Sequence, residues 1–522
     1  MANMKRKEGI LFILLALVVL GAGCTDKEQK EENQTSQTLY ISGQWSPTSI
    51  DPHLSGYMPQ RLEYAETLVG VDYEGKIIPN LAKSWEVSSD GKKWTFKLRE
   101  GVLFHDGTSF TAEVMKKSLE RSFIQSASTF GKIPVTSIET PDNLTLVISL
   151  NSTFPALPAY LSKGESVALA PGSYDASGNV TKPIGTGPFI FESWKPEEEI
   201  VVVKNPDYWG HVASVDKVVY RVIPEELTRK MLLDSKDIQV AMILSPDIAD
   251  KYTEKADYTV LEQPIARVRM IAFNTEKEPF NDKKVRQAIN YAIDREAIVN
   301  SVLYGYGNTA AGLFPPQFYW ANKDIAPYTY DTEKAKKLLN EAGWTDSDGD
   351  GILDKNGKPL KITLVTYPER AELPPIAEVI QQQLEKVGIK TELKVLNTDA
   401  SNAQRNKGNF DMYLVGRGLL FVPDPDEIMM TDYHSNGTSG DGWGAYRWHN
   451  DTVDKLIEQA RTTSDEAVRK KLYDEVQEIV VEEAPVAYLN YYVNIDVTTS
   501  NIKGYHLHPT EYSLDLQNVS IA

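Results

Sequence analysis

An acidic loop is the stretch of this sequence whose residue types and spacing most directly suggest chemistry. The segment DSDGDGILDKNG, residues 346–357, sets acidic side chains at alternate positions and then turns on a glycine. Carboxylates at this spacing, with one backbone carbonyl, are the ligands of a calcium-binding loop. The last position, where such a loop normally carries a bidentate glutamate, is Gly357. We expect a weak structural calcium site or, as the alternative, an ion-free turn; the ligands would be Asp346, Asp348, Asp350, Asp354 and the carbonyl of Ile352.

The sequence motifs typical of enzyme active sites are missing from this chain. It contains no GxSxG, HExxH, P-loop or CxxC motif. Asp424 and Asp426 form a carboxylate pair, but residues two apart seldom flank one scissile bond. His506 and His508 alternate near the C-terminus, where two exposed histidines are a simpler interpretation than a metal pair. The sequence therefore indicates a protein that is not an enzyme, with a secreted hydrolase as the weaker hypothesis.

The first residues have the features of a targeting segment. Basic residues precede an apolar run over residues 10–20, which is typical of a secretory signal and too short to cross a bilayer. Cys24, the only cysteine, follows small residues and resembles the lipidated cysteine of bacterial lipoproteins, although Gly21 stands where such signals usually carry leucine. We expect a signal peptide over 1–23, lipid on Cys24 and a flexible tether over 24–38. An ordinary cleavage site is the alternative.

Length and charge limit the classes of protein that the chain can represent. A chain of 522 residues is too long to fold around a single hydrophobic core. We therefore expect two to four domains of about 100–200 residues each. The formal net charge is −18, and no basic run follows the N-terminal one. Nucleic acid is therefore excluded as a partner, because binding phosphates requires clustered lysine and arginine.

The pattern of apolar residues predicts a mixed α/β fold. Residues 361–367 and 389–396 alternate like strands, and the segment between them repeats apolar residues with a helical period. Strand, helix and strand in this order predict a parallel crossover unit. Thr111 is predicted to cap a helix that runs through Leu119. No repeat of fixed period is present.

Aromatic residues gather in two short segments. The chain has nine tryptophans and 26 tyrosines, and they are concentrated at 442–448 and 488–492. Such rings line ligand clefts because they bury a large area at little entropic cost, but they also pack in cores. For each single ring the core is the better interpretation, and for the clusters both remain open.

Three longer segments closely resemble the extracytoplasmic solute-binding proteins of peptide and nickel ABC importers, known as family 5. They are FKLREGVLFHDGTSFTAEVMKKSLERS (96–122), IGTGPFIFESWKPEEEIVVVKNPDYWG (184–210) and FNTEKEPFNDKKVRQAINYAIDREAIV (273–299). The resemblance extends over residues 39–522. It implies an α/β, type II periplasmic-binding fold, in which two hinged lobes close over a ligand and a third domain is added.

The resemblance also implies domain limits. Lobe I would combine 39–52, 183–275 and 488–522; the extra domain would span 53–182, and lobe II 276–487. The chain would cross between lobes near 273–275 and 487–491, and these crossings would form the hinge.

The ligand is harder to predict than the fold. Peptide binders of this family capture the α-ammonium group with an aspartate a few residues before an acidic residue and proline, but Leu419, Leu420 and Phe421 occupy that stretch here. Asp424 or Asp426 could substitute, or form a solvated turn. Nickel binders carry histidine where this chain has Asp426. We rank peptides first, nickel or a nickel chelate second and another small solute third; the expected ligand-binding residues are Trp45, Asn274, Arg417, Asp424, Asp426, Trp443, Tyr446 and Tyr491.

The partners implied by the resemblance are those of an importer. They are a peptide or other small solute, a membrane permease with its ATPase subunits, and the membrane itself through the lipid on Cys24. The protein would be a monomer on the outer face of the cytoplasmic membrane of a prokaryote, with no cofactor besides the calcium. A receptor that signals without import is a further hypothesis.

Overall fold

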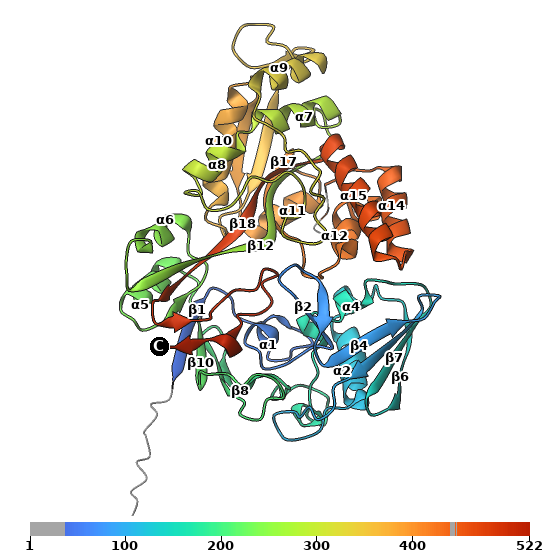
Figure 1. The fold of residues 1–522 in the computed structure, drawn as a ribbon. Coiled ribbons are helices and arrows are strands. Elements are labelled where there is room, and N and C mark those ends of the chain that lie inside the picture. Colours follow the sequence, from blue (N-terminus) through green and yellow to red (C-terminus); the bar gives the residue numbers. More distant parts are fainter. Residues whose placement is uncertain (1–36, 439–443, 445) are drawn as a thin grey trace, which may run out of the picture. The chain divides into compact units, whose positions relative to one another are not determined.

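A ten-stranded mixed sheet is the central element of the structure (Figure 1). The structure is a computed structural model that describes residues 37–438, 444 and 446–522. In spatial order the strands are β16 (Lys390–Val395), β15 (Lys361–Thr366), β17 (Met412–Gly418), β12 (Tyr258–Phe273), β18 (Val486–Thr499), β11 (Val240–Ala241), β1 (Thr38–Gly43), β10 (Lys217–Val222), β9 (Glu199–Lys204) and β8 (Phe189–Lys195).

Two long antiparallel strands, β12 and β18, join the two halves of this sheet. The C-terminal part of β12, residues 267–273, also pairs with β17, whereas Val497 and Thr498 of β18 pair with β11. The register between the two strands shifts between Pro264 and Val268. Proline cannot donate a ladder hydrogen bond, so an interruption at this point is expected.

The predicted crossover unit is confirmed. Strands β15 and β16 pair in parallel, and helix α10 (Leu373–Glu385) connects them. The helix buries Ile376, Ile380 and Leu384, which follow the helical period seen in the sequence. The local pattern was therefore sufficient to predict this unit.

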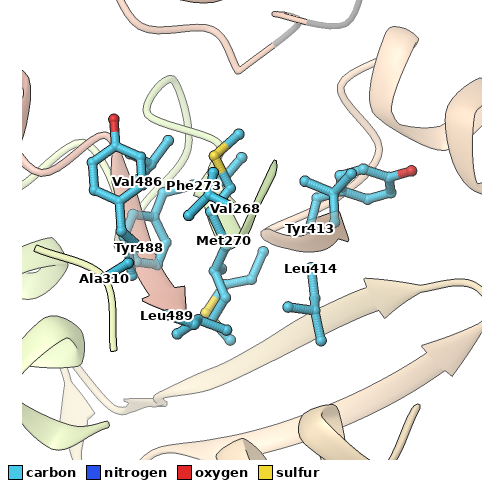
Figure 2. Close-up of a cluster of buried hydrophobic side chains, with 14 of the residues drawn as sticks. Val268, Met270, Phe273, Ala310, Tyr413, Leu414, Val486, Tyr488 and Leu489 are labelled. Carbon is cyan, nitrogen blue, oxygen red and sulfur yellow. The ribbon is translucent and has the colours of Figure 1, made fainter. Parts of the chain in front are cut away.

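The largest apolar core lies against β12, β17 and β18. Figure 2 shows part of it, including Val268, Met270, Leu414 and Leu489. The helices with buried residues in the described part of this core are α7 (Lys283–Ala292), α8 (Arg295–Ser301), α9 (Thr332–Glu341), α10, α12 (Pro425–Asp432), α14 (Asp451–Thr462) and α15 (Glu466–Glu483). Two further helices of the fold are α11 (Thr398–Asn406) and α13 (Ser435–Thr438).

A second core belongs to a four-stranded antiparallel sheet. Its order is β4 (Ala82–Val87), β5 (Lys93–Leu98), β7 (Thr145–Leu150) and β6 (Val135–Asp142), and helix α2 (Ala112–Gln125) contacts β6 and β7. The predicted cap is confirmed, because the Thr111 side chain accepts a hydrogen bond from the backbone N–H of Val114. Phe96, Leu146 and Ile148 are fully buried in this core.

A third apolar cluster surrounds β1, β8, β9 and β10. It includes Leu39, Ile41, Val202 and Val218, all fully buried.

Shorter elements complete the fold: α1 (Tyr57–Arg61), β2 (Val69–Val71), β3 (Ile77–Pro79), α3 (Ala127–Phe130), α4 (Leu157–Tyr160), α5 (Glu226–Asp234), α6 (Pro246–Ala249), β13 (Asp354–Lys355), β14 (Lys358–Pro359), β19 (Ile502–Lys503) and β20 (Ser520–Ile521). The mixed α/β prediction is confirmed, whereas the predicted domain limits stay a prediction. Within the described ranges, no helix has the length and apolar character needed to cross a membrane.

Candidate ligand-binding site

A cavity of about 280 Å³ is lined by segments that are far apart in the sequence. Helix α1 and residues 162–165 form one side, the β17–α12 segment forms a second and residues 510–512 form a third. Its apolar lining includes Tyr57, Leu419, Leu420, Phe421, Ile428 and Tyr512. We call it the central cavity.

Charged groups of both signs line the central cavity. Glu427, in the first turn of α12, is half-buried, and its carboxylate has no hydrogen-bond or ion-pair partner among the described residues. Lys163, from the other side of the cavity, is likewise half-buried, and the described residues include no partner for its ammonium group. The two groups come from segments far apart in the sequence but line the same cavity. A ligand that carries both a positive and a negative charge could therefore contact both side chains.

Arg417 lines the central cavity as predicted among the site residues, but its guanidinium also has a protein partner. Its Nε and Nη2 atoms donate to the Asp432 carboxylate at 2.7 and 2.8 Å. Asp432 is only 1% exposed, so this bidentate ion pair is buried. The pair holds the guanidinium in a fixed orientation at the wall of the cavity.

Asp424 and Asp426 both lie in buried ion pairs. The two oxygens of Asp424 accept from the Arg469 guanidinium at 2.8 and 2.9 Å, and one of them also accepts from the Asp426 backbone N–H, which caps α12. Asp426 accepts from the Nε atom of Arg461 at 2.7 Å. Neither aspartate lines the central cavity. Their predicted role in capturing an ammonium group stays a prediction, while the structure gives both a packing role.

Asp426 also connects two regions of the chain. The Tyr160 hydroxyl, at the end of α4, donates to its carboxylate at 3.2 Å. Burial is the main cause that raises the pKa of Asp426, Arg461 opposes this shift, and the neighbouring Asp424 carboxylate adds to it. The buried network therefore ties the segment before residue 182 to helices α12 and α14.

Three other predicted ligand residues are held by the backbone or the core. Asn274 is 1% exposed, and its amide donates to the carbonyls of Gly408 and Phe410. Tyr446 is 2% exposed within the largest core, and Tyr491 donates its hydroxyl proton to the Gly312 carbonyl at 3.1 Å. None of the three lines the central cavity. Their ligand contacts stay a prediction.

Trp45 lies next to the central cavity instead of on its wall. Its ring meets that of Tyr57 edge to face at 5.9 Å, and the Arg61 guanidinium lies over both rings. Arg61 is fully buried and also donates to the Glu511 carbonyl. Trp45 therefore supports α1, which supplies Tyr57 to the cavity. The predicted residues Trp443 and Cys24 lie outside the described residues.

The acidic loop has the geometry of three converging carboxylates. Asp346, Asp348 and Asp350 are exposed, and ligand atoms from each lie within 4.8 Å of one another. Asp354 does not join them, because its carboxylate accepts from the Ser347 backbone N–H and hydroxyl. A short hairpin of β13 and β14 ends the loop, so the second helix that an EF-hand requires does not follow it.

Several cavity residues were not identified from the sequence. Glu427, Lys163, Tyr57 and Tyr512 are common surface residue types, and no local spacing marks them as a group. The one available signal was for Glu427, which follows the Asp424–Pro425 pair that marks the ligand region in the resembled family. Convergence of three segments is a tertiary property that local patterns do not encode.

The prediction of two exposed histidines near the C-terminus is wrong for His508. His506 is exposed, but His508 is only 3% exposed. Its ring lies 4.9 Å from that of Tyr73 and 5.1 Å from that of Tyr512, measured between ring centres. The segment after β19 folds back onto the body of the protein, which the sequence pattern did not indicate.

Comparison with known proteins identifies the family. The family model described as bacterial extracellular solute-binding proteins, family 5 Middle, matches residues 76–440. The nickel-binding periplasmic protein of Escherichia coli is 31% identical over 468 residues, which cover 85% of this chain and 87% of that protein. The oligopeptide-binding protein AppA of Bacillus subtilis is 32% identical over 461 residues, covering 84% and 82%.

The fold agrees with a solved relative. The structure of NikA from Brucella suis in complex with Fe(III)-EDTA superposes with a TM-score of 0.85 at 27% identity, and it covers 93% of this chain and 100% of that one. The predicted two-lobed periplasmic-binding fold is thereby confirmed. The relatives are solute-binding proteins and not enzymes. The chain therefore belongs to the bacterial extracellular solute-binding proteins of family 5, and it is the substrate-binding protein of an ABC importer.

Proposed function

We propose that this protein captures short peptides in the central cavity and delivers them to a membrane permease. The observation that carries the proposal is the presence of an unpaired carboxylate, Glu427, and an unpaired ammonium, Lys163, on separate segments of the cavity wall. A peptide is a zwitterion, so its α-ammonium can pair with Glu427 and its α-carboxylate with Lys163. A ligand that contacts both sides of the central cavity stabilises the closed state of the two lobes, since it binds that state better than the open one.

The size and lining of the central cavity favour peptides of two or three residues. Its volume of about 280 Å³ is just below the ~300–1,000 Å³ typical of small-molecule sites. Leu419, Leu420, Phe421 and Tyr57 supply apolar surface that accepts side chains of different shapes. The relative AppA is named an oligopeptide-binding protein, which supports the same class of ligand.

A nickel chelate is the second candidate. It is supported by the name of the Escherichia coli relative and by the Fe(III)-EDTA in the NikA structure. An anionic chelate could pair with Lys163 and lie against Arg417. No histidine lines the central cavity within the described ranges, so direct coordination of bare nickel has no ligand there.

Native mass spectrometry separates these candidates. We expect protein purified gently from its own cells to carry a mass increase that matches a short peptide, and we expect unfolding to release that peptide. Titration of the ligand-depleted protein with alanyl-alanine and with a nickel–histidine chelate provides the control. Copurification of a divalent metal or metal chelate, with no peptide, would refute the peptide proposal and support the second candidate.

We also propose that the protein is held at the outer face of the cytoplasmic membrane by lipid on Cys24. The cysteine directly follows the small residues that end the predicted signal peptide. Residues 25–36 have no apolar side chain and would act as a tether that keeps the binding protein close to its permease. The tether predicted from the sequence ends earlier than residue 38, because Thr38 already belongs to β1 and pairs with Lys217 of β10.

The acidic loop is proposed to bind one calcium ion weakly. Asp346, Asp348 and Asp350 supply converging carboxylates, with the Ile352 carbonyl and water as further ligands. Asp354 would have to give up its hydrogen bonds to Ser347 in order to join them.

Calcium is expected to raise the melting temperature of the protein. We expect a dissociation constant of roughly 10⁻⁴–10⁻³ M. Free calcium at about ten times the dissociation constant would then stabilise the fold by about 1.4 kcal/mol. The D348N/D350N variant should lose this response, and magnesium, which prefers a stricter octahedral site, should give a smaller one. An unchanged melting temperature at millimolar calcium means that the segment is a plain turn.

A further inference from the structure

A second cavity lies beside the central one and has a different character. Its volume is about 320 Å³, and Gln60, Val71 and Tyr512 line both cavities. Four carboxylates line it, and its described lining contains no lysine or arginine; the four are Glu63, Glu66, Asp72 and Asp515. We call it the acidic cavity.

Neutral donors hold the two most buried carboxylates in place. Glu63 accepts hydrogen bonds from the Ser513 hydroxyl and from the backbone N–H groups of Leu516 and Gln517, at 2.6–3.0 Å. Glu66 accepts from the side chains of Thr186, Tyr208 and Trp209 at 2.8–2.9 Å. These contacts orient the carboxylates but leave their negative charge without an ion-pair partner.

Burial makes this uncompensated charge unfavourable. It raises the pKa of Glu63 and of Glu66 to about 7, and that of Asp515 to about 6. The Arg99 guanidinium, which lies 4.7 Å from the Trp209 ring centre, lowers the pKa of Glu66 but does not offset its burial. A cation in the cavity would favour the ionised carboxylates and would itself be stabilised by them.

His508 provides an independent indication that a ligand belongs in the acidic cavity. It lines the cavity and is only 3% exposed, and its Nδ1 atom accepts from the Thr510 backbone N–H at 3.2 Å. The neutral ring therefore carries its proton on Nε2, which is buried and makes no well-directed hydrogen bond, although the backbone of Val71 acts on the ring. An unmet buried donor costs free energy, and an acceptor atom on a ligand would satisfy it.

The geometry distinguishes an organic cation from a metal ion. Among the described residues, the only group of three or more metal-ligating side chains with converging ligand atoms is the Asp346 loop. No three carboxylates of the acidic cavity therefore have ligand atoms within 4.8 Å of one another. Tyr73, Tyr208 and Tyr512 line the same cavity, and aromatic faces attract organic cations.

We propose that the acidic cavity binds a small organic cation, an ammonium or guanidinium compound that also carries a hydrogen-bond acceptor for His508. This site is separate from the central cavity and does not depend on what the central cavity binds. Because Gln60, Val71 and Tyr512 belong to both walls, an occupant of one cavity lies against side chains that contact the other.

The test compares a cationic probe with its neutral isostere on the detergent-solubilised full chain. N-acetylputrescine carries an ammonium group and an amide carbonyl, and N-pentylacetamide replaces the ammonium with a methyl group. We expect isothermal titration calorimetry to show at least tenfold tighter binding of N-acetylputrescine. The D72N/D515N variant should lose at least tenfold of that affinity, since it removes two of the four carboxylates that line the cavity.

A matched variant controls for the loss of charge. Asp175 accepts from the backbone N–H groups of Ser177 and Asn179, just as Asp72 accepts from those of Glu74 and Lys76, but it lines neither cavity. D175N should therefore bind the probe like the unmodified protein. Asp515 has a φ of +50°, a conformation that asparagine also tolerates, and melting curves check that each variant is folded.

Three outcomes overturn the proposal. They are no binding of N-acetylputrescine at 10 mM, equal binding of the cation and its neutral isostere, and full binding retained in D72N/D515N. The last outcome would place the cation outside the acidic cavity. Failure of the peptide proposal alone would leave the response to N-acetylputrescine unchanged.

Discussion

Replacing Asp424 with alanine is expected to lower the free energy of unfolding by about 3–5 kcal/mol. Asp424 and its partner Arg469 are 5% and 4% exposed, and both oxygens of the carboxylate accept from the guanidinium. The substitution leaves a buried arginine without a counter-charge, which costs more than the ion pair itself is worth. It also removes the side-chain cap of α12.

Denaturant unfolding measured on a series of variants separates these contributions. D424N keeps a capping side chain but removes the charge, so it should retain the part of the stability that comes from the cap, about 1 kcal/mol. The double variant D424L/R469M removes both charges and should recover most of the loss, because an apolar pair of similar size is often tolerated. A loss below about 1 kcal/mol in D424A would show that the ion pair is not a buried anchor.

The same variants test the sequence-based role of Asp424 in ligand capture. If folded D424N binds peptide as tightly as the unmodified protein, the carboxylate acts only in packing. A selective loss of affinity for peptides with a free α-ammonium, at unchanged stability, would restore the ligand role predicted from the sequence.

Local patterns predicted the elements of the fold better than the contacts between them. The helical period between 376 and 387 and the strands on either side were sufficient for the crossover unit of β15, α10 and β16. Thr111 likewise acts within three residues of its own position. Both features depend on interactions among neighbours in the sequence, which the residue pattern records directly.

The aspartates of the candidate site show why its geometry could not be predicted. Residue type and spacing singled out Asp424 and Asp426, but their partners, Arg469 and Arg461, follow 45 and 35 residues later, on α15 and α14. Only the packed helices bring each arginine to its carboxylate. Without that information, the sequence does not distinguish a carboxylate that is paired with an arginine from one that can bind a ligand.

Aromatic clusters led to a similar ambiguity. Tyr446, Tyr488 and Tyr491 are all less than 10% exposed, and the Tyr488 hydroxyl lies 2.7 Å from that of Tyr433. For these rings the interpretation as core residues fits the structure. The rings that do line the central cavity, Tyr57, Phe421 and Tyr512, stand alone in the sequence, where aromatic density gives no signal.

Glu427→Gln is expected to weaken the binding of a dipeptide by about 30- to 150-fold, which corresponds to about 2–3 kcal/mol. The carboxylate is half-buried on the wall of the central cavity and makes no hydrogen bond or salt bridge within the described residues. The Arg417 guanidinium acts on it electrostatically but is itself paired with Asp432, so the carboxylate is available to a ligand ammonium group. Glutamine keeps the size of the side chain and removes its charge. Calorimetric titration with alanyl-alanine measures the effect directly.

Two controls make this result specific to the ligand ammonium group. Glu165 lines the same cavity, so E165Q removes an equal charge and should change the affinity much less if Glu427 is the capturing group. N-acetyl-alanyl-alanine lacks the ammonium and should bind E427Q and the unmodified protein equally. If the acetylated dipeptide loses as much affinity in E427Q as the free one, Glu427 shapes the cavity without pairing with the ligand. If E165Q gives the larger loss, the ammonium is captured on the opposite wall, and the orientation of the bound peptide is reversed.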